Sequence, residues 1–373
     1  MTQALSEAQD LAPDFAPDYA SARAAFLDAA AAAGATLESR PHPGLGLQGE
    51  ALSLDLAWLG PRQASRVLLS LSGTHGVEGL YGSGCQVAFL RQQAGHSLPP
   101  DTAVLLLHAL NPYGFSWLRR VNEDNIDINR NYIDFRADLP ENEAYNEVHP
   151  WLLPQQWTPE TCAVLQAQVQ GYMQRVGPQA AARALSGGQY QHADGIFYGG
   201  RALCWSNQQL AAVAHSHLQQ ARSLCVLDHH TGLGPSGHTE LICRHPPDSR
   251  ALALARHWWG GDVTSPASGE SASAVIDGNV RMALRALCPQ ALVVAVALEV
   301  GTQAQQQVMF SLFADNWLHQ RGDPLSAQGT KIRQQVRDAF FVDTPAWRAV
   351  SLTRALEIYQ QGLKGMQALQ AAA

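Results

Sequence analysis

Four short runs of apolar residues limit the fold of this 373-residue chain more than any other feature. Each run has the length of a β-strand, and each is apolar at consecutive rather than alternate positions. Strands of this kind are buried on both faces of a sheet, so helices must cover both sides. The runs are VLLSLS at 67–72, AVLLLHAL at 103–110, LCVLD at 224–228 and ALVVAVAL at 291–298.

Helix-length segments are interspersed with these runs. GLYGSGCQVAFLRQQAG at 79–95 has helix length, and SARAAFLDAAAAAGA at 21–35 is predicted to be a helix that Gly34 ends. Residues 351–369 form an amphipathic helix, and the alternating leucines of 51–60 predict a half-buried strand. We therefore expect an α/β fold: a three-layer α/β/α sandwich with a mixed, mostly parallel central sheet.

The domain organisation follows from the same pattern. Residues 1–48 are expected to be an N-terminal helical preamble packed on the domain, and 49–373 a single catalytic domain. A segment at about 136–220 is rich in Gln, Ala and Pro and has no strong strand pattern. It predicts an insertion with one or two helices near the entrance to a site.

Composition excludes several classes of function. The net charge of −7 leaves no basic surplus for a phosphate backbone, so no nucleic-acid partner is expected. No apolar stretch reaches the roughly 18–20 residues of a membrane span, and the acidic N-terminus is unlike a signal peptide. We expect a cytoplasmic protein. Its six cysteines form no CxxC pair, which predicts buried, reduced thiols.

Polar residues follow all four apolar runs, where each predicted strand ends. Open α/β sheets bind ligands at the carboxyl ends of their strands, so these residues can meet in one crevice. The four segments are Gly73-Thr-His75-Gly-Val-Glu78, Asn111-Pro112-Tyr113-Gly114, Asp228-His229-His230-Thr231 and Glu299-Val300-Gly301.

Two of these segments carry the residues of a zinc site. His75 and Glu78 are three positions apart, which places both on one side of a turn. A catalytic zinc takes three protein ligands, and the third is expected from His229 or His230, because adjacent strand residues point in opposite directions. We expect one Zn²⁺ per chain. Surface or capping roles are expected for the histidines at 215, 217, 257 and 319.

The polar segment NEDNIDINRN at 122–131 is expensive to bury unless every group is paired. Arg130 can clamp a substrate carboxylate, and Asn129 can add hydrogen bonds to it. Asp127 can orient a metal-bound histidine. Arg119 or Arg120 can stabilise a developing oxyanion. The alternative for the whole segment is an exposed polar loop.

Glu299 ends the most apolar of the predicted strands. A carboxyl group beside an apolar wall has a raised pKa, which suits a general base that takes a proton from water and returns it to a leaving amine. The alternative is an ion-paired glutamate at the end of a strand.

Taken in order, these motifs resemble the zinc carboxypeptidase superfamily, which includes carboxypeptidase A and a shorter branch with aspartoacylase and succinylglutamate desuccinylase. The resemblance covers about residues 50–310 and is closest to a bacterial branch catalogued as a domain of unknown function. The matching motifs are His75-Gly-Val-Glu78, Asn111-Pro112-Tyr113-Gly114-Phe115, Asp127-Ile-Asn129-Arg130-Asn131, Asp228-His229-His230-Thr231-Gly232 and Glu299-Val-Gly.

This resemblance assigns a role to each candidate residue. It implies that His75, Glu78 and His230 are the zinc ligands, with His230 preferred because the family's ligand directly precedes a small Ser or Thr. It makes Glu299 the catalytic glutamate and Arg120 the arginine that polarises the scissile carbonyl, with Arg119 as the fallback. Asn129 and Arg130 match the pair that holds the terminal carboxylate of the substrate.

The sequence departs from the family pattern in three places. The interval from Arg120 to Asn129 is shorter than in the digestive carboxypeptidases and closer to the deacylase branch. Tyr113 stands where the family more often has Asp. The family's mobile pocket tyrosine is not identified, with Tyr190 and Tyr198 as candidates.

The sequence therefore predicts a zinc-dependent hydrolase that cleaves an amide bond next to a carboxylate-bearing residue. Two alternatives stay open: a deacylase of N-acyl amino acids, and a non-catalytic module that binds a metal or a peptide carboxylate. The expected partner is a small peptide or an N-acyl amino acid, and an oligomer is compatible with the sequence. A serine hydrolase is disfavoured, because Gly82-Ser83-Gly84 lacks the GxSxG elbow.

Overall fold

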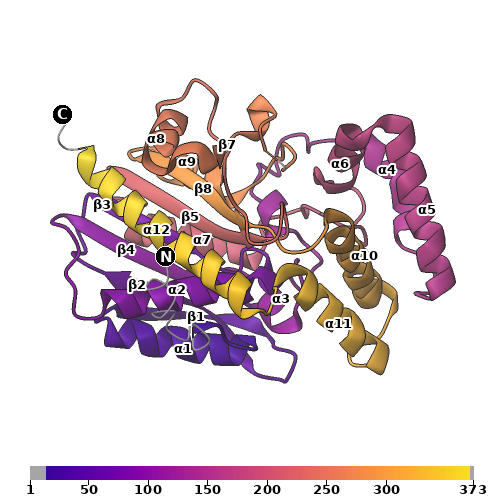
Figure 1. Ribbon diagram of the computed structural model, residues 1–373, viewed down its shortest axis with the longest axis horizontal. Coiled ribbons are helices and arrows are strands. Elements are labelled where there is room, and N and C mark those ends of the chain that lie inside the picture. The colour runs from indigo at the N-terminus through magenta and orange to yellow at the C-terminus, as the bar shows by residue number, and fades with distance from the viewer. Residues whose placement is uncertain (1–13, 272, 370–373) are drawn as a thin grey trace, which may run out of the picture.

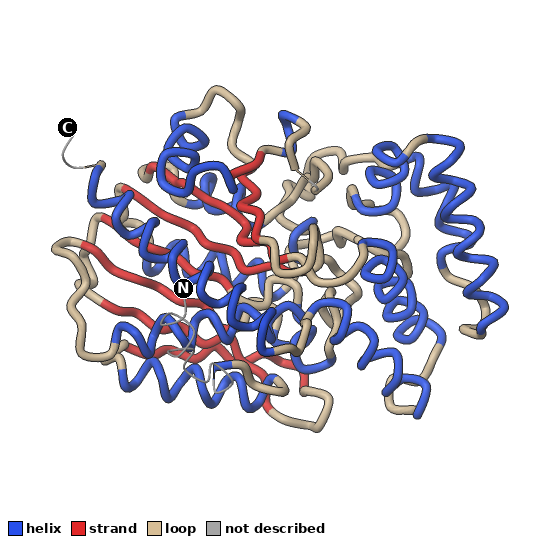
Figure 2. The backbone as a smooth tube through the Cα atoms, in the orientation of Figure 1, coloured by secondary structure: helices blue, strands red, loops and turns tan. Residues whose placement is uncertain are grey.

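A mixed sheet of eight strands lies at the centre of the computed structural model, which describes residues 14–271 and 273–369 (Figure 1; Figure 2). The strand order across the sheet is β1-β2-β4-β3-β5-β8-β6-β7. The strands are β1 (Thr36–Leu45), β2 (Ala51–Leu59), β3 (Arg66–Leu71), β4 (Thr102–His108), β5 (Ser223–Thr231), β6 (Thr239–Cys243), β7 (Val263–Thr264) and β8 (Leu292–Val300).

The four predicted apolar runs form the parallel centre of this sheet. They are β4, β3, β5 and β8, which lie next to one another in that order and pair in parallel. β1 and β2 join antiparallel on one side, and β6 pairs antiparallel with β8 on the other. The mixed, mostly parallel sheet that the sequence predicts is confirmed.

Helices cover both faces of the sheet. One face packs against α1 (Tyr19–Ala32), α2 (Gly79–Gln93), α8 (Arg250–Trp259) and α12 (Pro345–Ala368), and the other against α7 (Trp205–His217) and α9 (Val280–Leu287). Successive strand residues alternate between the two cores: Leu68 belongs to the first and Leu69 to the second. The three-layer α/β/α sandwich is therefore confirmed.

The prediction that β2 is half-buried is wrong, because α1 covers its polar side. Ser53 and Asp55 are both buried. The Ser53 N–H donates to the Tyr19 hydroxyl at 2.8 Å, and Arg23 pairs with Asp55 at 2.6 Å. Two residues of α1 thus satisfy the polar groups that alternate along the strand.

The predicted preamble contains more than a helix. Its first 13 residues lie outside the described part of the chain, and α1 forms as expected. Residues 36–45, however, form the edge strand β1, which pairs with β2. No sequence pattern indicated β1, because its side chains are mostly exposed and do not alternate between apolar and polar.

The segment at about 136–220 holds four helices rather than the one or two expected. α7 belongs to the sandwich, because it packs on the sheet. α4 (Glu143–Leu152), α5 (Pro159–Val176) and α6 (Pro178–Ser186) instead share a separate core with α10 (Gln305–Arg321) and α11 (Ala327–Phe340). Figure 1 shows these five helices together beside one end of the sheet. We refer to them as the side layer.

Short elements complete the described chain. They are α3 (Pro112–Trp117), η2 (Gly76–Glu78), η3 (Ile128–Arg130), η4 (Gly260–Asp262) and η5 (Pro266–Ser268). The six cysteines are free thiols, and all but the half-buried Cys162 are buried, as expected. Within the described residues, no helix combines the length and apolarity needed to cross a membrane.

Candidate functional site

The carboxyl ends of three neighbouring strands bring the predicted metal ligands together. β3 leads into His75 and η2, β5 ends with His230 and Thr231, and β8 carries Glu299. Since β3, β5 and β8 lie side by side and run in parallel, their ends share one edge of the sheet. His230 and Glu299 are direct neighbours across the β5–β8 pair.

A tight turn after β3 places His75 and Glu78 on the same side. η2 lies against α3 so closely that a Cβ at Gly76 would stand 2.0 Å from the carbonyl carbon of Gly114. The Gly76 N–H donates to the Arg120 carbonyl at 3.1 Å, which ties this turn to the segment that carries the candidate arginines. Glycine is therefore required at 76 for close backbone packing.

His75, Glu78 and His230 converge on one point and are all buried. The Nδ1 atom of His75 lies 2.9 Å from Glu78 Oε1, and the Nδ1 atom of His230 lies 2.7 Å from Glu78 Oε2. The two Nδ1 atoms are 3.1 Å apart. His230 lies more than 150 positions after the other two residues, and the structure brings all three together as predicted.

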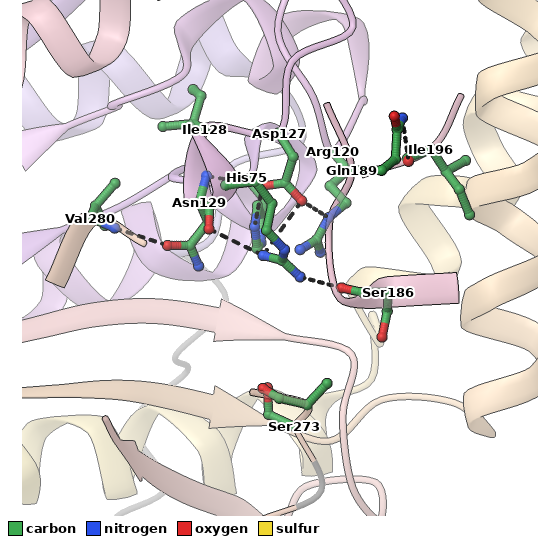
Figure 3. A network of polar contacts seen from close by, with 12 residues as sticks. His75, Arg120, Asp127, Ile128, Asn129, Ser186, Gln189, Ile196, Ser273 and Val280 are labelled. Atoms are coloured by element: carbon green, nitrogen blue, oxygen red, sulfur yellow. Dashed lines mark hydrogen bonds and ion pairs between the residues drawn. The ribbon is translucent and has the colours of Figure 1, made fainter. Parts of the chain in front are cut away.

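The outer nitrogens of both imidazoles face carboxylates. His230 Nε2 lies 2.8 Å from Asp228 Oδ2, and His75 Nε2 lies 3.4 Å from Asp127 Oδ1, the residue expected to orient a ligand (Figure 3). A carboxylate can only accept, so each Nε2 would keep its proton if a cation were bound, and each Nδ1 would then be free to act as a ligand. The two Nδ1 atoms and the Glu78 carboxylate lie within 3.1 Å of one another, close enough to share one cation.

The electrostatics of the three residues also favour positive charge at their centre. Burial alone would lower the pKa of His230, but the negative charges of Asp228 and Glu78 outweigh it and raise that pKa to about 10. Burial would likewise raise the pKa of Glu78, yet the two histidines lower it to about 2. Two imidazole nitrogens and a carboxylate are a typical ligand set for a catalytic zinc, and the residues present fit that ion.

Adjacent histidines in β5 face opposite sides of the sheet, as the sequence predicts. His230 points into the cavity, whereas the Nε2 atom of His229 lies 2.9 Å from the hydroxyl group of Tyr359 on α12. Burial in that apolar layer lowers the pKa of His229 to about 3. His229 therefore belongs to the packing of α12. None of the histidines at 215, 217, 257 and 319 belongs to the metal cluster.

Glu299 lines the same cavity as the three candidate ligands. It is buried, and its Oε1 atom accepts a hydrogen bond from the Leu233 N–H at 3.1 Å. Burial, with a further contribution from the negative charge of Glu78, raises the pKa of Glu299 to about 8. No ion-pair partner lies within 4.0 Å of it among the described residues, which disfavours the interpretation of Glu299 as an ion-paired strand end.

The adjacent arginines 119 and 120 point to different places. Arg120 lines the cavity, with its Nε donating to Asp127 at 3.1 Å and its NH1 group 3.4 Å from Glu78. Arg119 is buried beside Asp315 of α10, at 3.3 Å, and does not line the cavity. The fallback assignment to Arg119 is therefore not supported by the geometry.

Asn129 and Arg130 also line the cavity, from η3. Arg130 donates to the carbonyl oxygens of Asn129, at 3.2 Å, and Ser186, at 2.7 Å, and its NH1 group lies 3.8 Å from Asp127. Its Nε has no partner in the described chain. Asn129 accepts a hydrogen bond from the Val280 N–H at 3.1 Å, which fixes its side chain. The guanidinium carbon of Arg130 lies 5.4 Å from the centre of the Phe197 ring.

The two candidate tyrosines support this region instead of lining the cavity. The hydroxyl of Tyr190 donates to the Arg130 carbonyl at 2.6 Å, and the Tyr198 carbonyl accepts from the Asp127 N–H at 2.8 Å. Tyrosine is absent from the described residues that line the cavity. The predicted insertion does contribute to the lining of the cavity, through Ala182, Ser186 and Phe197.

Two arginines of the cavity were missed at the level of sequence. Arg281 donates to Asp228 at 2.6 Å, so the carboxylate that orients His230 is itself held by a buried cation. Arg244 lines the cavity from the end of β6. Arg281 was missed because it lies on a short amphipathic helix, where an arginine is usually exposed. Arg244 was missed because β6, the strand that precedes it, was not predicted.

Comparison with solved structures supports the fold. Bovine thrombin-activatable fibrinolysis inhibitor, in complex with tick carboxypeptidase inhibitor, is similar to this chain with a TM-score of 0.52 at 11% identity, over 94% of this chain and 96% of that one. Succinylglutamate desuccinylase from Chromobacterium violaceum matches with a TM-score of 0.36 at 17% identity, over 81% and 77%. Only the first likeness bears on the fold, which is carboxypeptidase-like.

No curated protein matches the chain. A family model described as "Protein of unknown function (DUF2817)" matches residues 15–354, which confirms the predicted relationship to a branch of unknown function. With most of its length covered by that model, the chain belongs to the DUF2817 family.

Proposed function

We propose that this protein is a zinc-dependent hydrolase that cleaves an amide bond next to a carboxylate-bearing residue. The observation that carries the proposal is the convergence of His75 Nδ1, Glu78 and His230 Nδ1, with a carboxylate behind each imidazole. Such second carboxylates fix the tautomer of a ligating histidine and raise its basicity.

The chain's own groups suit the chemistry of hydrolysis. The zinc, when bound, would polarise the scissile carbonyl and make a water molecule more acidic. Glu299 would take the proton from that water and pass it to the leaving amine, a role for which a pKa near neutrality is suited. Arg120 would stabilise the negative charge that develops on the carbonyl oxygen.

Substrate binding is assigned to the wall formed by η3. Arg130 would hold a carboxylate of the substrate through its free Nε and remaining N–H groups, and Asn129 would add hydrogen bonds. The substrate would be a small peptide or an N-acyl amino acid, acted on in the cytoplasm. The alternative of a binding module without catalysis is disfavoured by Glu299, because binding alone needs no buried general base.

Metal analysis with a substrate panel tests the proposal. The purified protein should contain about one zinc per chain, lose activity on chelation and regain it with zinc. A panel of dipeptides and N-acyl amino acids separates a carboxypeptidase from a deacylase of N-acyl amino acids. A protein that binds no zinc, or that stays active after complete removal of zinc, would refute the proposal.

A further inference from the structure

Arg244 is a cation of the cavity that the proposed chemistry does not use. It follows β6 directly, two positions after Ile242, so both side chains lie on the cavity side of the sheet edge. Its NH1 group donates to the Ala274 carbonyl at 2.9 Å and its NH2 group to the Ser273 hydroxyl at 2.6 Å. Its Nε is buried and has no hydrogen-bond partner among the described residues.

Arg244 differs from two other cavity arginines in lacking a counter-ion. Arg120 pairs with Asp127 at 3.1 Å, and Arg281 pairs with Asp228 at 2.6 Å. No carboxylate of the described chain lies within 4.0 Å of Arg244, whose polar contacts are all neutral. Arg244 is half-buried, and the carboxylates of Glu299 and Glu240 act on its charge only from beyond ion-pair distance, so a bound anion would offset the cost of removing this charge from water.

The position of Arg244 is also separate from that of Arg130. Arg130 is held by the Ser186 carbonyl at the end of α6, whereas Arg244 is held by Ser273 on the loop before α9. Figure 3 shows Ser186 and Ser273 on different segments of the chain. Burial, and then the positive charges of Arg281 and Arg130, lower the pKa of Arg244, so an anion placed here would relieve repulsion as well. The cavity thus contains two arginines that are held by different segments of the chain.

We propose that Arg244 binds an acidic side chain of the same substrate residue whose main-chain carboxylate Arg130 holds. This inference rests on the proposed hydrolase and narrows its substrates to those with an aspartate- or glutamate-like residue next to the scissile amide. The Nε–H and the remaining N–H groups of Arg244 supply the hydrogen bonds, and the guanidinium supplies the charge.

A matched pair of substrates isolates this charge. N-acyl dipeptides that end in Glu or in Gln have nearly the same shape and differ by one negative charge. The zinc-loaded wild type should show a kcat/KM ratio of Glu over Gln on the order of ten- to a hundred-fold, the usual size of a charged hydrogen bond. Arg244→Met should bring that ratio close to one. Arg285→Met, at an exposed arginine of α9, is the matched control and should keep the wild-type ratio.

Binding of the products separates this inference from the proposed function. Calorimetry with L-glutamate and L-glutamine should show that zinc-loaded wild type favours glutamate and that Arg244→Met does not. If no amide is cleaved but this Arg244-dependent preference is seen, the hydrolase is refuted and the anion position stands. If amides are cleaved without a preference for Glu, the anion position is refuted and the hydrolase stands.

Two further results bear on a merely structural role for Arg244. Equal losses on both substrates, with the Glu preference intact, would show that Arg244 only holds the loop at Ser273 and would overturn the inference. Thermal melting checks the fold of each variant. If Arg244→Met does not fold, Arg244→Gln takes its place, because it removes the charge but can still donate to the Ala274 carbonyl.

Discussion

Replacing Glu299 with glutamine should lower the catalytic rate and, at higher pH, raise the stability of the metal-free protein. Glutamine is nearly isosteric with glutamate, and its amide oxygen can still accept the Leu233 N–H, so the fold should persist. Loss of a general base typically lowers kcat by about 10²- to 10⁴-fold. The zinc content should stay at the wild-type level, because Glu299 is not among the three candidate ligands.

The stability of the metal-free protein provides the second readout. The pKa of Glu299 is raised from 4.5 to about 8, so the fold favours its neutral form. Stability from that protonated form is complete below pH 4.5 and is lost as the pH rises towards 8. At about 1.4 kcal/mol per pKa unit, burial of this carboxyl group costs the fold roughly 2 kcal/mol at pH 6 and between about 4 and 5 kcal/mol at pH 8.5.

Urea unfolding of the metal-free proteins at these two pH values tests the reasoning. The stability of Glu299→Gln relative to wild type should increase by about 2.5 kcal/mol from pH 6 to pH 8.5. Glu240→Gln is the matched control, since Glu240 lies opposite Glu299 on β6, is buried and does not line the cavity. An active Glu299→Gln, or a relative stability that does not change with pH, would refute the assignment of Glu299 as a desolvated base.

Three other changes have definite expected outcomes. Asp228→Asn should weaken zinc binding by about 10- to 100-fold, because the orientation of His230 is lost; competition with a chelator measures this, and unchanged affinity would count against the site. Arg130→Ala should raise KM by about ten-fold or more for substrates with a free carboxylate but not for their amides, and an equal rise for both would contradict the clamp. Burial lowers the pKa of His108 to about 4, so its unfolded form takes up a proton below pH 6.5 while the folded form does not. Stability should therefore fall by about 2 kcal/mol between pH 7 and pH 5 from this residue alone, and urea midpoints should show a weaker fall in His108→Gln.

The centre of the sheet was predictable because its strands carry their own signal. β3, β4, β5 and β8 are buried on both faces and are therefore continuously apolar. β1, β6 and β7 were not predicted. β1 is largely exposed, and β6 and β7 are too short for a pattern of side chains to emerge. The omission of β6 also hid Arg244, whose place in the cavity depends on that strand.

The convergence of the three candidate metal ligands was predictable for a related reason. Each follows or ends an apolar strand, and the topology of parallel strands brings such positions to one edge. The choice between His229 and His230 could not be made in this way, because it depends on which face of β5 each histidine occupies. His230 meets Asp228 and Glu78 in the cavity, whereas His229 meets Tyr359 in the apolar layer, and neither Glu78 nor Tyr359 is near in sequence.

The two neighbouring arginines could not be separated from the sequence, because their directions depend on distant partners. Leu118 ends α3 in the left-handed conformation, with φ of 56°, and the chain then turns sharply. Arg119 consequently points to Asp315 on α10, a residue almost two hundred positions away, while Arg120 points to Asp127 and Glu78. The guanidinium group of Arg119 therefore pairs with a carboxylate of the side layer, whereas that of Arg120 lies in the cavity. Arg119 also donates to the Asn122 carbonyl and the Asn125 side chain nearby, but the position of Asp315 beside it cannot be read from the sequence around residues 119 and 120.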